Sequence, residues 1–212
     1  MSFQYSRFYH TWLKRPCDII FSLLLFICTS PIFIIVTILI KVASPSGSVF
    51  YAHQRIGRNH QPFACWKFRT MLPDADKKLV KYLETNPAMK EEFERDFKLK
   101  KDPRILPVIG HFLRFTSLDE LPQIFNVLRG DMSMIGPRPI TQAELPRYGE
   151  HVNTLLSVRP GITGLWQVSG RNDVSYNKRV ELDMFYIMHI NFFFDLQIAL
   201  KTVLVILLHK GY

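Results

Sequence analysis

The sequence predicts a helix-dominated α+β fold that is attached to a membrane near its N-terminus. Three observations lead to this fold class. Residues 19–40 form one uncharged apolar run, residues 49–71 alternate as a small β-hairpin does, and later stretches have the apolar spacing of amphipathic surface helices. A chain of 212 residues has room for one sizeable core. We therefore expect a membrane segment over residues 1–43 and one surface domain over residues 44–212.

Composition and charge narrow the class of protein. Hydrophobic residues make up 48% of the chain, which is too many for a disordered protein. The 27 Lys and Arg outnumber the 18 Asp and Glu, so the net charge of +9 favours nucleic acid, anionic lipid or a phosphorylated substrate as partner. Three widely spaced cysteines without a CxxC pair argue against a disulfide framework or a zinc site. The motifs of zinc proteases, P-loop enzymes and dinucleotide-binding enzymes are also missing from the sequence.

The apolar run over residues 19–40 is long enough to cross the ~30 Å hydrocarbon core of a bilayer. Pro31 lies near its middle, where a proline removes one backbone hydrogen bond and its ring collides with the carbonyl of Ile27. These residues leave two interpretations open, a kinked spanning helix and a re-entrant hairpin with both ends in the cytoplasm. The positive-inside rule does not choose, because basic residues stand on both sides: Arg7, Lys14 and Arg15 before the run, and Lys41, Arg55 and Arg58 after it.

The hairpin predicted over residues 49–71 has its turn at residues 57–59. Alternation in the second strand places Trp66 and Phe68 on one face, and Lys67 and Arg69 on the other. These two charges could simply be solvated.

The acidic pair Asp119 and Glu120 precedes a short helix that we predict from about Pro122 to Arg129, because proline suits a first turn and Gly130 suits a helix end. One interpretation is a capping box with Ser117 as the N-cap, although Pro122 weakens it. The other is a Mg²⁺ site that meets a phosphate, since Mg²⁺ is usually held by one or two carboxylates and substrate oxygens.

Two arginines near this pair are candidate phosphate ligands. Arg114 precedes it, and Arg138 lies between Pro137 and Pro139, which stiffen the backbone around a guanidinium whose fork matches phosphate oxygens. A structural turn is the plain alternative for the second arginine.

Two later segments also allow two interpretations each. Residues 157–173 combine three glycines with arginines and Trp166, which suits either close approach to a ligand or a tight turn around a core tryptophan. Residues 191–210 form an apolar stretch that suits either a helix on a membrane surface or a core helix.

Taken together, these segments resemble the bacterial sugar transferase family, the small monotopic polyprenyl-phosphate phosphoglycosyl transferases. The resemblance runs from about Lys14 to the end of the chain. It is carried by KRPCDII, the SP pair in the apolar run, KFRTM, TSLDELPQIFNVLRGDMSMIGPRP, RPGITGLWQVSGRND and ELDMFY. Within the family, the segment WQVSGRND resembles the galactose-1-phosphate transferases and some modified-sugar transferases more than the glucose-1-phosphate branch.

The resemblance implies an enzyme that moves a sugar-1-phosphate from a UDP-sugar to undecaprenyl phosphate and releases UMP. It implies Asp119 as the nucleophile that carries an aspartyl-phosphosugar intermediate, with Glu120 beside it and Mg²⁺ held by both. It also implies a monotopic protein whose re-entrant helix is broken at Ser30-Pro31. The family's motif positions that would bind substrate phosphates, uridine or metal are Lys67, Arg69, Arg114, Arg138, Gln167, Arg171 and Asp183.

Further expectations follow from the same resemblance. The surface domain would be catalytic and would lie on the cytoplasmic face of the bacterial inner membrane, in contact with membrane lipid. Larger family members carry additional membrane helices and a domain before this part, so the chain is either a minimal member or a catalytic fragment. Self-association is left open. A non-catalytic membrane scaffold is the alternative function, and nucleic acid is disfavoured because the aromatic residues cluster in apolar stretches.

Overall fold

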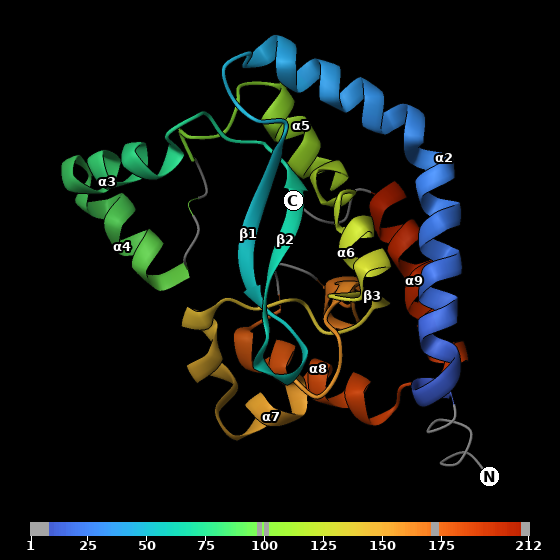
Figure 1. Ribbon diagram of the computed structural model, residues 1–212. Coiled ribbons are helices and arrows are strands. Elements are labelled where there is room, and N and C mark those ends of the chain that lie inside the picture. Colours follow the sequence, from blue (N-terminus) through green and yellow to red (C-terminus); the bar gives the residue numbers. More distant parts are fainter. Residues whose placement is uncertain (1–8, 97–98, 100–101, 171–173, 209–212) are drawn as a thin grey trace.

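The computed structural model describes residues 9–96, 99, 102–170 and 174–208. Helices dominate these residues (Figure 1). The strands form two small sheets of two strands each. The predicted helix-dominated α+β class is confirmed.

The long apolar helix α2 (Lys14–Ala43) contains the predicted apolar run and follows a π-helical turn at Tyr9–Leu13. Within the described residues, Tyr9–Ala43 is the one helical segment that is long and apolar enough to cross a membrane. The expected interruption takes the form of a bend, because the helix continues through Pro31 (Figure 1). The Ser30 hydroxyl donates a hydrogen bond of 2.9 Å to the Ile27 carbonyl, the group that the proline leaves without its helical donor.

Both halves of α2 pack on the same folded body. In the first half, Asp18 accepts hydrogen bonds from the Ser133 hydroxyl and the Met134 backbone N–H at 2.9 and 3.0 Å. In the second half, Phe33 and Ile40 are buried in a cluster with Phe68 and other core residues. A helix that crossed the bilayer would separate its two ends by ~30 Å of hydrocarbon. The packing therefore favours the re-entrant interpretation and is that of a monotopic membrane protein.

The outer face of α2 is apolar and exposed along both halves. This face carries Ile20, Leu24, Ile27, Ile34, Ile38 and Val42. A contiguous apolar surface of this kind marks contact with a membrane or with another protein.

The predicted hairpin is confirmed. Strand β1 (Phe50–Ile56) pairs antiparallel with β2 (Pro62–Phe68), and Tyr51 stands opposite Lys67. The turn is a 3₁₀ segment at Arg58–His60, in which Asn59 adopts the left-handed conformation that asparagine tolerates. The second sheet pairs β3 (Ser133–Ile135) in parallel with β4 (Gly161–Thr163).

The remaining helices surround these sheets, and the pair α3 and α4 projects from the body (Figure 1). The helix predicted from about Pro122 is α6, with Pro122 just before its first residue and Gly130 in the left-handed conformation at its end. The α-helices are α3 (Ala75–Thr85), α4 (Pro87–Asp96), α5 (Ile109–Phe115), α6 (Gln123–Arg129), α7 (Val152–Leu155), α8 (Tyr176–Met188) and α9 (Phe192–Leu207). The 3₁₀ helices outside the hairpin are Leu118–Glu120, Gln142–His151 and Trp166–Val168.

The last helix, α9, has one face in the core and one exposed apolar face, so each of the two interpretations of its sequence, core helix and surface helix, describes one face. Its inner face enters the core through Ile198, which is buried. Its outer face exposes large apolar side chains such as Phe193, Leu200 and Leu204. The start of α9 contacts the turn before α2, where the rings of Tyr9 and Phe192 meet edge to face at 5.9 Å. The N-terminal ends of α2 and α9 therefore lie next to each other.

Candidate active site

The acidic pair lies on the 3₁₀ turn Leu118–Glu120 between α5 and α6. Asp119 is buried, and Ser117 before it has a left-handed backbone with φ of 58°. The Ser117 side chain makes no capping hydrogen bond, and the Glu120 side chain turns toward β2. The capping-box interpretation of this pair is therefore wrong, because Glu120 is used in a contact outside its own turn.

Lys67 on β2 is the partner of both carboxylates. Its Nζ atom donates a hydrogen bond of 2.6 Å to Oε1 of Glu120 and lies 3.8 Å from Oδ2 of Asp119. The sequence placed Lys67 among the candidate substrate ligands, and the structure shows that its present contacts are the two acidic side chains. Glu120 is held in a short ion pair, while Asp119 has the longer and weaker contact.

The pKa values of these three groups follow from burial and from this pairing. Burial raises the pKa of Asp119 to about 6, although the Lys67 ammonium opposes the change. Burial acts to raise the pKa of Glu120 as well, but the charge and hydrogen bond of Lys67 outweigh it and lower that pKa. Burial acts to lower the pKa of Lys67, and the carboxylates of Glu120 and Asp119 raise it overall. At neutral pH the site therefore holds a stable Lys67–Glu120 ion pair beside an ionised Asp119.

Arg114 approaches the same site from α5. Its Nε donates a hydrogen bond of 2.9 Å to the Thr70 hydroxyl. Its positive charge also acts to lower the pKa of Asp119. Arg114 is thus an anchored cation close to the candidate nucleophile.

Arg138 occupies a loop that other residues hold firmly. Arg55 donates to the Pro139 carbonyl at 3.1 Å, and the Ile56 backbone N–H donates to the Ile140 carbonyl at 2.9 Å. Arg55 also pairs with Glu144 at 3.1 Å. The sequence had treated Arg55 only as a basic flank of the membrane run, and its role in the loop depends on contacts 84 residues away.

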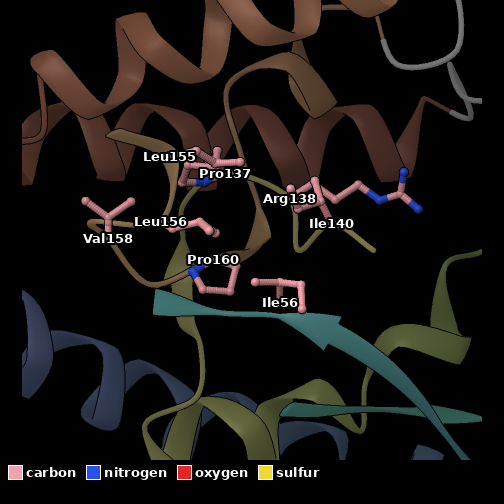
Figure 2. A pocket seen from close by; sticks show the side chains of 8 residues that line it. All are labelled: Ile56, Pro137, Arg138, Ile140, Leu155, Leu156, Val158 and Pro160. Carbon is pink, nitrogen blue, oxygen red and sulfur yellow. The ribbon is translucent and has the colours of Figure 1, made fainter. Parts of the chain in front are cut away.

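The guanidinium of Arg138 has no hydrogen bond or ion pair with any residue that the structure describes. Figure 2 shows its side chain extending away from a small apolar cavity at the base of the loop. The cavity is lined by Ile56, Pro137, Arg138, Ile140, Leu155, Leu156, Val158 and Pro160. The positive charge of Arg138 lowers the pKa of Glu120 and of Asp183, so the guanidinium lies within electrostatic range of both. An anchored loop with an unpaired guanidinium is suited to bind a phosphate.

Glycines bring the Arg138 loop against the segment that contains β4. A Cβ atom on Gly161 would lie 2.1 Å from the Gly136 nitrogen, and one on Gly164 would lie 2.2 Å from the Gly136 oxygen. Only glycine fits at such distances. These glycines therefore permit close approach of two backbone segments. Of the two interpretations of this stretch, these contacts support the tight structural turn, and Trp166 is buried as that interpretation expects.

The other predicted site residues lie in different surroundings. Arg69 directs its hydrogen bonds to Ser44, Ser48 and Met71, which close the loop after α2. Gln167 donates to the Ile162 carbonyl at 3.1 Å, and its buried Oε1 has no partner among the described residues. Arg171 lies outside the described residues.

Asp183 on α8 is fully buried. Its Oδ2 atom accepts a hydrogen bond of 2.9 Å from the Tyr148 hydroxyl, and its Oδ1 atom has no partner among the described residues. Burial raises the pKa of Asp183 to about 7, although the Tyr148 hydrogen bond and the charges of Arg138 and Arg179 oppose the change. The charge of Arg138 thus acts on the pKa of Asp183 as well as on that of Glu120 in the acidic pair.

Two residues that support the site, Glu144 and Asn126, were missed in the prediction from the sequence. Glu144 accepts from the backbone N–H and the hydroxyl of Thr141, which is a capping box at the start of the 3₁₀ segment Gln142–His151. The spacing Thr-x-x-Glu was a usable sequence signal for Glu144. Asn126 on α6 carried no such signal, because it stands in the buried face of a short helix.

The acidic pair suits a magnesium ion that arrives with a phosphate. Asp119 and Glu120 offer carboxylate oxygens, which Mg²⁺ prefers, and Mg²⁺ commonly takes its remaining ligands from water and substrate phosphates. Among the described residues, no group of three His, Cys, Asp or Glu side chains could hold a metal ion alone. The donor set thus fits an ion that is shared with the substrate.

Comparison with known proteins shows which sequences this chain is similar to. The model of the bacterial sugar transferase family matches residues 9–209. The undecaprenyl-phosphate galactose phosphotransferase of Salmonella typhimurium is 48% identical over 94% of this chain and 41% of its own length. The exopolysaccharide production protein ExoY of Sinorhizobium fredii is 46% identical over 93% of this chain and 87% of its own length. The UDP-galactose-lipid carrier transferase of Erwinia amylovora is 45% identical over 94% of this chain and 41% of its own length. The chain thus spans about two fifths of the first and third relatives.

Proposed function

Because this chain belongs to the bacterial sugar transferase family, we propose that it transfers a sugar-1-phosphate from a UDP-sugar to undecaprenyl phosphate and releases UMP. The reaction would be the first membrane step in the assembly of a surface glycan. The observation that supports it most directly is the buried Asp119 beside the Lys67–Glu120 ion pair. The names of the relatives favour galactose as the sugar, so UDP-galactose is the first donor to test.

In the first step, a carboxylate oxygen of Asp119 attacks the phosphorus that carries the sugar. The bond from that phosphorus to the oxygen bridging it to the rest of the nucleotide breaks, and UMP leaves with the electron pair. An ionised carboxylate needs no general base, which agrees with a pKa of about 6 for Asp119. The product on the protein is an acyl phosphate, a high-energy intermediate.

In the second step, a phosphate oxygen of undecaprenyl phosphate attacks the same phosphorus. The Asp119 carboxylate leaves, and the lipid-linked sugar diphosphate forms. Both steps depend mainly on positioning and charge neutralisation, as phosphoryl transfers generally do. Arg138 and Arg114 would bind phosphate oxygens, while Lys67 keeps Glu120 oriented. Mg²⁺ held by Asp119 and Glu120 would supply further neutralisation of the diphosphate when bound.

The membrane helix supports the same proposal. Because both halves of α2 pack on the body that carries Asp119, the site lies close to the bilayer surface, where the phosphate of a lipid carrier is accessible. With both ends of α2 on one side of the membrane, the basic residues Arg15 and Lys41 at these ends favour the cytoplasmic face of the inner membrane.

Covalent loading tests the proposed function. Purified protein is incubated with Mg²⁺ and radiolabelled UDP-galactose without acceptor, and protein-bound label and UMP are measured. We expect one UMP for each labelled site, loss of label in hydroxylamine, and mapping of the label to Asp119 by mass spectrometry. Asp119→Asn should abolish both loading and turnover, whereas Glu120→Gln should slow the reaction without preventing loading.

Glu150→Gln, which changes an exposed glutamate, is the matched control and should behave as the wild type. Label on another residue, or kinetics that require both substrates together, would favour direct attack by the lipid phosphate. No UMP release from any UDP-sugar in the presence of undecaprenyl phosphate would instead support a non-catalytic membrane scaffold.

A further inference from the structure

One side chain of α6 covers the edge of β2 that faces away from β1. Asn126 is fully buried, and its Oδ1 atom accepts a hydrogen bond of 2.9 Å from the Trp66 backbone N–H. Its Nδ2 atom donates to the Ala64 carbonyl at 2.7 Å and to Oδ2 of Asp131 at 3.1 Å. The side-chain amide therefore pairs with β2 as the peptide group of a neighbouring strand would.

This contact joins the two elements that build the acidic site. On β2, the residue after Trp66 is Lys67, whose ammonium binds Glu120. On the other side, α6 begins directly after the turn that carries Asp119 and Glu120. Asn126 forms hydrogen bonds with the backbone of Ala64 and of Trp66, which are two residues apart on β2. These two bonds fix both the position of α6 along the strand and its distance from the strand. The register between the ammonium and the carboxylates thus depends on the helix–strand contact at Asn126.

The chemistry of the position requires an amide. An aspartate there would keep the acceptor for the Trp66 N–H, but it would place a carboxylate oxygen against the Ala64 carbonyl and the Asp131 carboxylate. An apolar residue would leave the two strand groups buried without partners. Glutamine has the same groups, but its additional methylene would displace α6 from β2.

We propose that Asn126 is a positioning residue for the transfer reaction, which sets Lys67 against Glu120 and Asp119 by holding α6 to β2. The expected loss of kcat rests on the proposed function. The expected loosening of α6 from β2 rests on the described contacts alone. The far end of α6 has its own anchor, because Arg15 of the membrane helix donates to the carbonyls of Val127 and Leu128. A change at Asn126 therefore loosens the middle of α6 while its end stays attached to α2.

The test is Asn126→Asp, with kcat and KM for UDP-galactose measured beside the thermal unfolding midpoint. A misplacement of about 1 Å at a reacting group lowers the rate about 100-fold, so we expect kcat to fall by that order while KM changes about twofold or less. Val127→Ala is the matched control, since it shortens a buried neighbour on α6 that packs on Cys65 of β2 but leaves the Asn126 hydrogen bonds in place. It should lower the unfolding midpoint but leave kcat within about threefold of the wild type.

Hydrogen exchange at the Trp66 amide gives a second measurement that is independent of activity. Exchange should become about 10-fold faster or more in Asn126→Ala, because the Trp66 amide loses its acceptor. It should also become faster in Asn126→Asp, because repulsion by the Ala64 carbonyl and the Asp131 carboxylate displaces the acceptor oxygen, and it should stay near wild type in Val127→Ala. Asp131→Ala is the milder variant if the others do not fold, because Asp131 is partly exposed and, apart from a long 4.0 Å ion pair with Arg129, its side chain contacts the Asn126 amide. It should lower kcat a few-fold and speed Trp66 exchange in parallel.

The two proposals fail in different ways. The proposed function fails if the wild-type protein releases no UMP from any UDP-sugar. The positioning role of Asn126 fails if Asn126→Asp and Val127→Ala lose kcat in proportion to their unfolding midpoints, or if Trp66 exchange is unchanged in the Asn126 variants. The hydrogen-exchange measurement tests the contact between α6 and β2 even if no UDP-sugar substrate has been identified.

Discussion

Lys14, the first residue of the membrane helix α2, donates a hydrogen bond of 2.5 Å to Asp195 on α9, 181 residues later in the chain. The Tyr9 and Tyr186 hydroxyls donate to the same carboxylate at 2.8 and 2.7 Å. All four side chains are buried. This cluster fastens the start of the membrane helix to the last two helices of the fold.

Removing the negative charge from this cluster should destabilise the protein. Asp195→Asn leaves the Lys14 ammonium buried without a carboxylate, and breaking a buried ion pair in this way lowers stability by about 3 to 5 kcal/mol. Unfolding in one detergent, followed by circular dichroism, measures the change. The double variant Lys14→Met with Asp195→Leu should regain part of the loss, because no charge is then left unpaired. Equal stability of wild type and Asp195→Asn would contradict the buried pairing.

The topology of α2 can be tested by labelling. Thr11→Cys and Ser46→Cys place thiols at exposed positions before and after the helix, in a background without the native cysteines. An impermeant maleimide should label both positions in inverted vesicles and neither in right-side-out vesicles. Labelling of the two positions from opposite faces would contradict the re-entrant arrangement.

Pro31→Ala should alter that pattern. The substitution restores a backbone donor for the Ile27 carbonyl and removes the ring that bends the helix. We expect a straighter α2, and part of the population should then label at Thr11→Cys and Ser46→Cys from opposite faces. Val42→Ala, a change at an exposed position near the end of α2 and away from Pro31, is the control and should keep both labels on one face.

Arg138→Lys tests the phosphate role of the anchored loop. Lysine keeps the charge but loses the planar fork that matches phosphate oxygens, so transfer should slow roughly 10- to 100-fold. The unfolding midpoint should not change, because the guanidinium makes no hydrogen bond to the residues described in the structure. Arg129→Lys, at an exposed arginine, should keep wild-type kinetics. Wild-type kinetics in Arg138→Lys would return this loop to a structural role.

Asp183 should make stability depend on pH. Burial raises its pKa to about 7 in the folded protein, so between about pH 4 and pH 7 the folded state binds more protons than the unfolded state. Stability from this group is therefore greatest at low pH and is lost as pH rises through 7, by roughly 2 to 4 kcal/mol.

Asp183→Asn removes this dependence and provides the measurement. The unfolding midpoint of the wild type relative to Asp183→Asn should be highest near pH 5 and should decrease by pH 8. Other titrating groups are common to both proteins and cancel in the difference. A difference that stays constant from pH 5 to pH 8 would show that Asp183 ionises with an ordinary pKa.

Elements that depend on local pattern could be predicted from the sequence. The length of the apolar run, the alternation of the hairpin, and the proline and glycine at the ends of α6 each act within a few residues. The candidate site was also recognised as a set of segments, because Asp119 and Glu120 are adjacent and the Arg138 loop follows soon after them. The bend of α2 belongs here as well, since it depends on Pro31 and the neighbouring Ser30 hydroxyl.

The partners of the site residues could not be predicted, because they come from distant parts of the chain. Lys67 and Arg69 stand on the same face of a strand by alternation. The structure directs Lys67 to Glu120, 53 residues away, and Arg69 to the loop after α2. No local pattern distinguishes these two cations, since the choice depends on which element packs beside each one.

The sequence by itself determined that this protein has a membrane segment, a hairpin and an acidic pair before a short helix, because apolar length, alternation and backbone preferences act locally. Only the tertiary structure decided that both halves of α2 rest on one body, that Asn126 holds α6 to β2, and that Asp183 is fully buried. These features arise when segments far apart in the chain exclude water from between them. The burial and the ion pairs that set the pKa values of the site residues exist only once these segments have packed together.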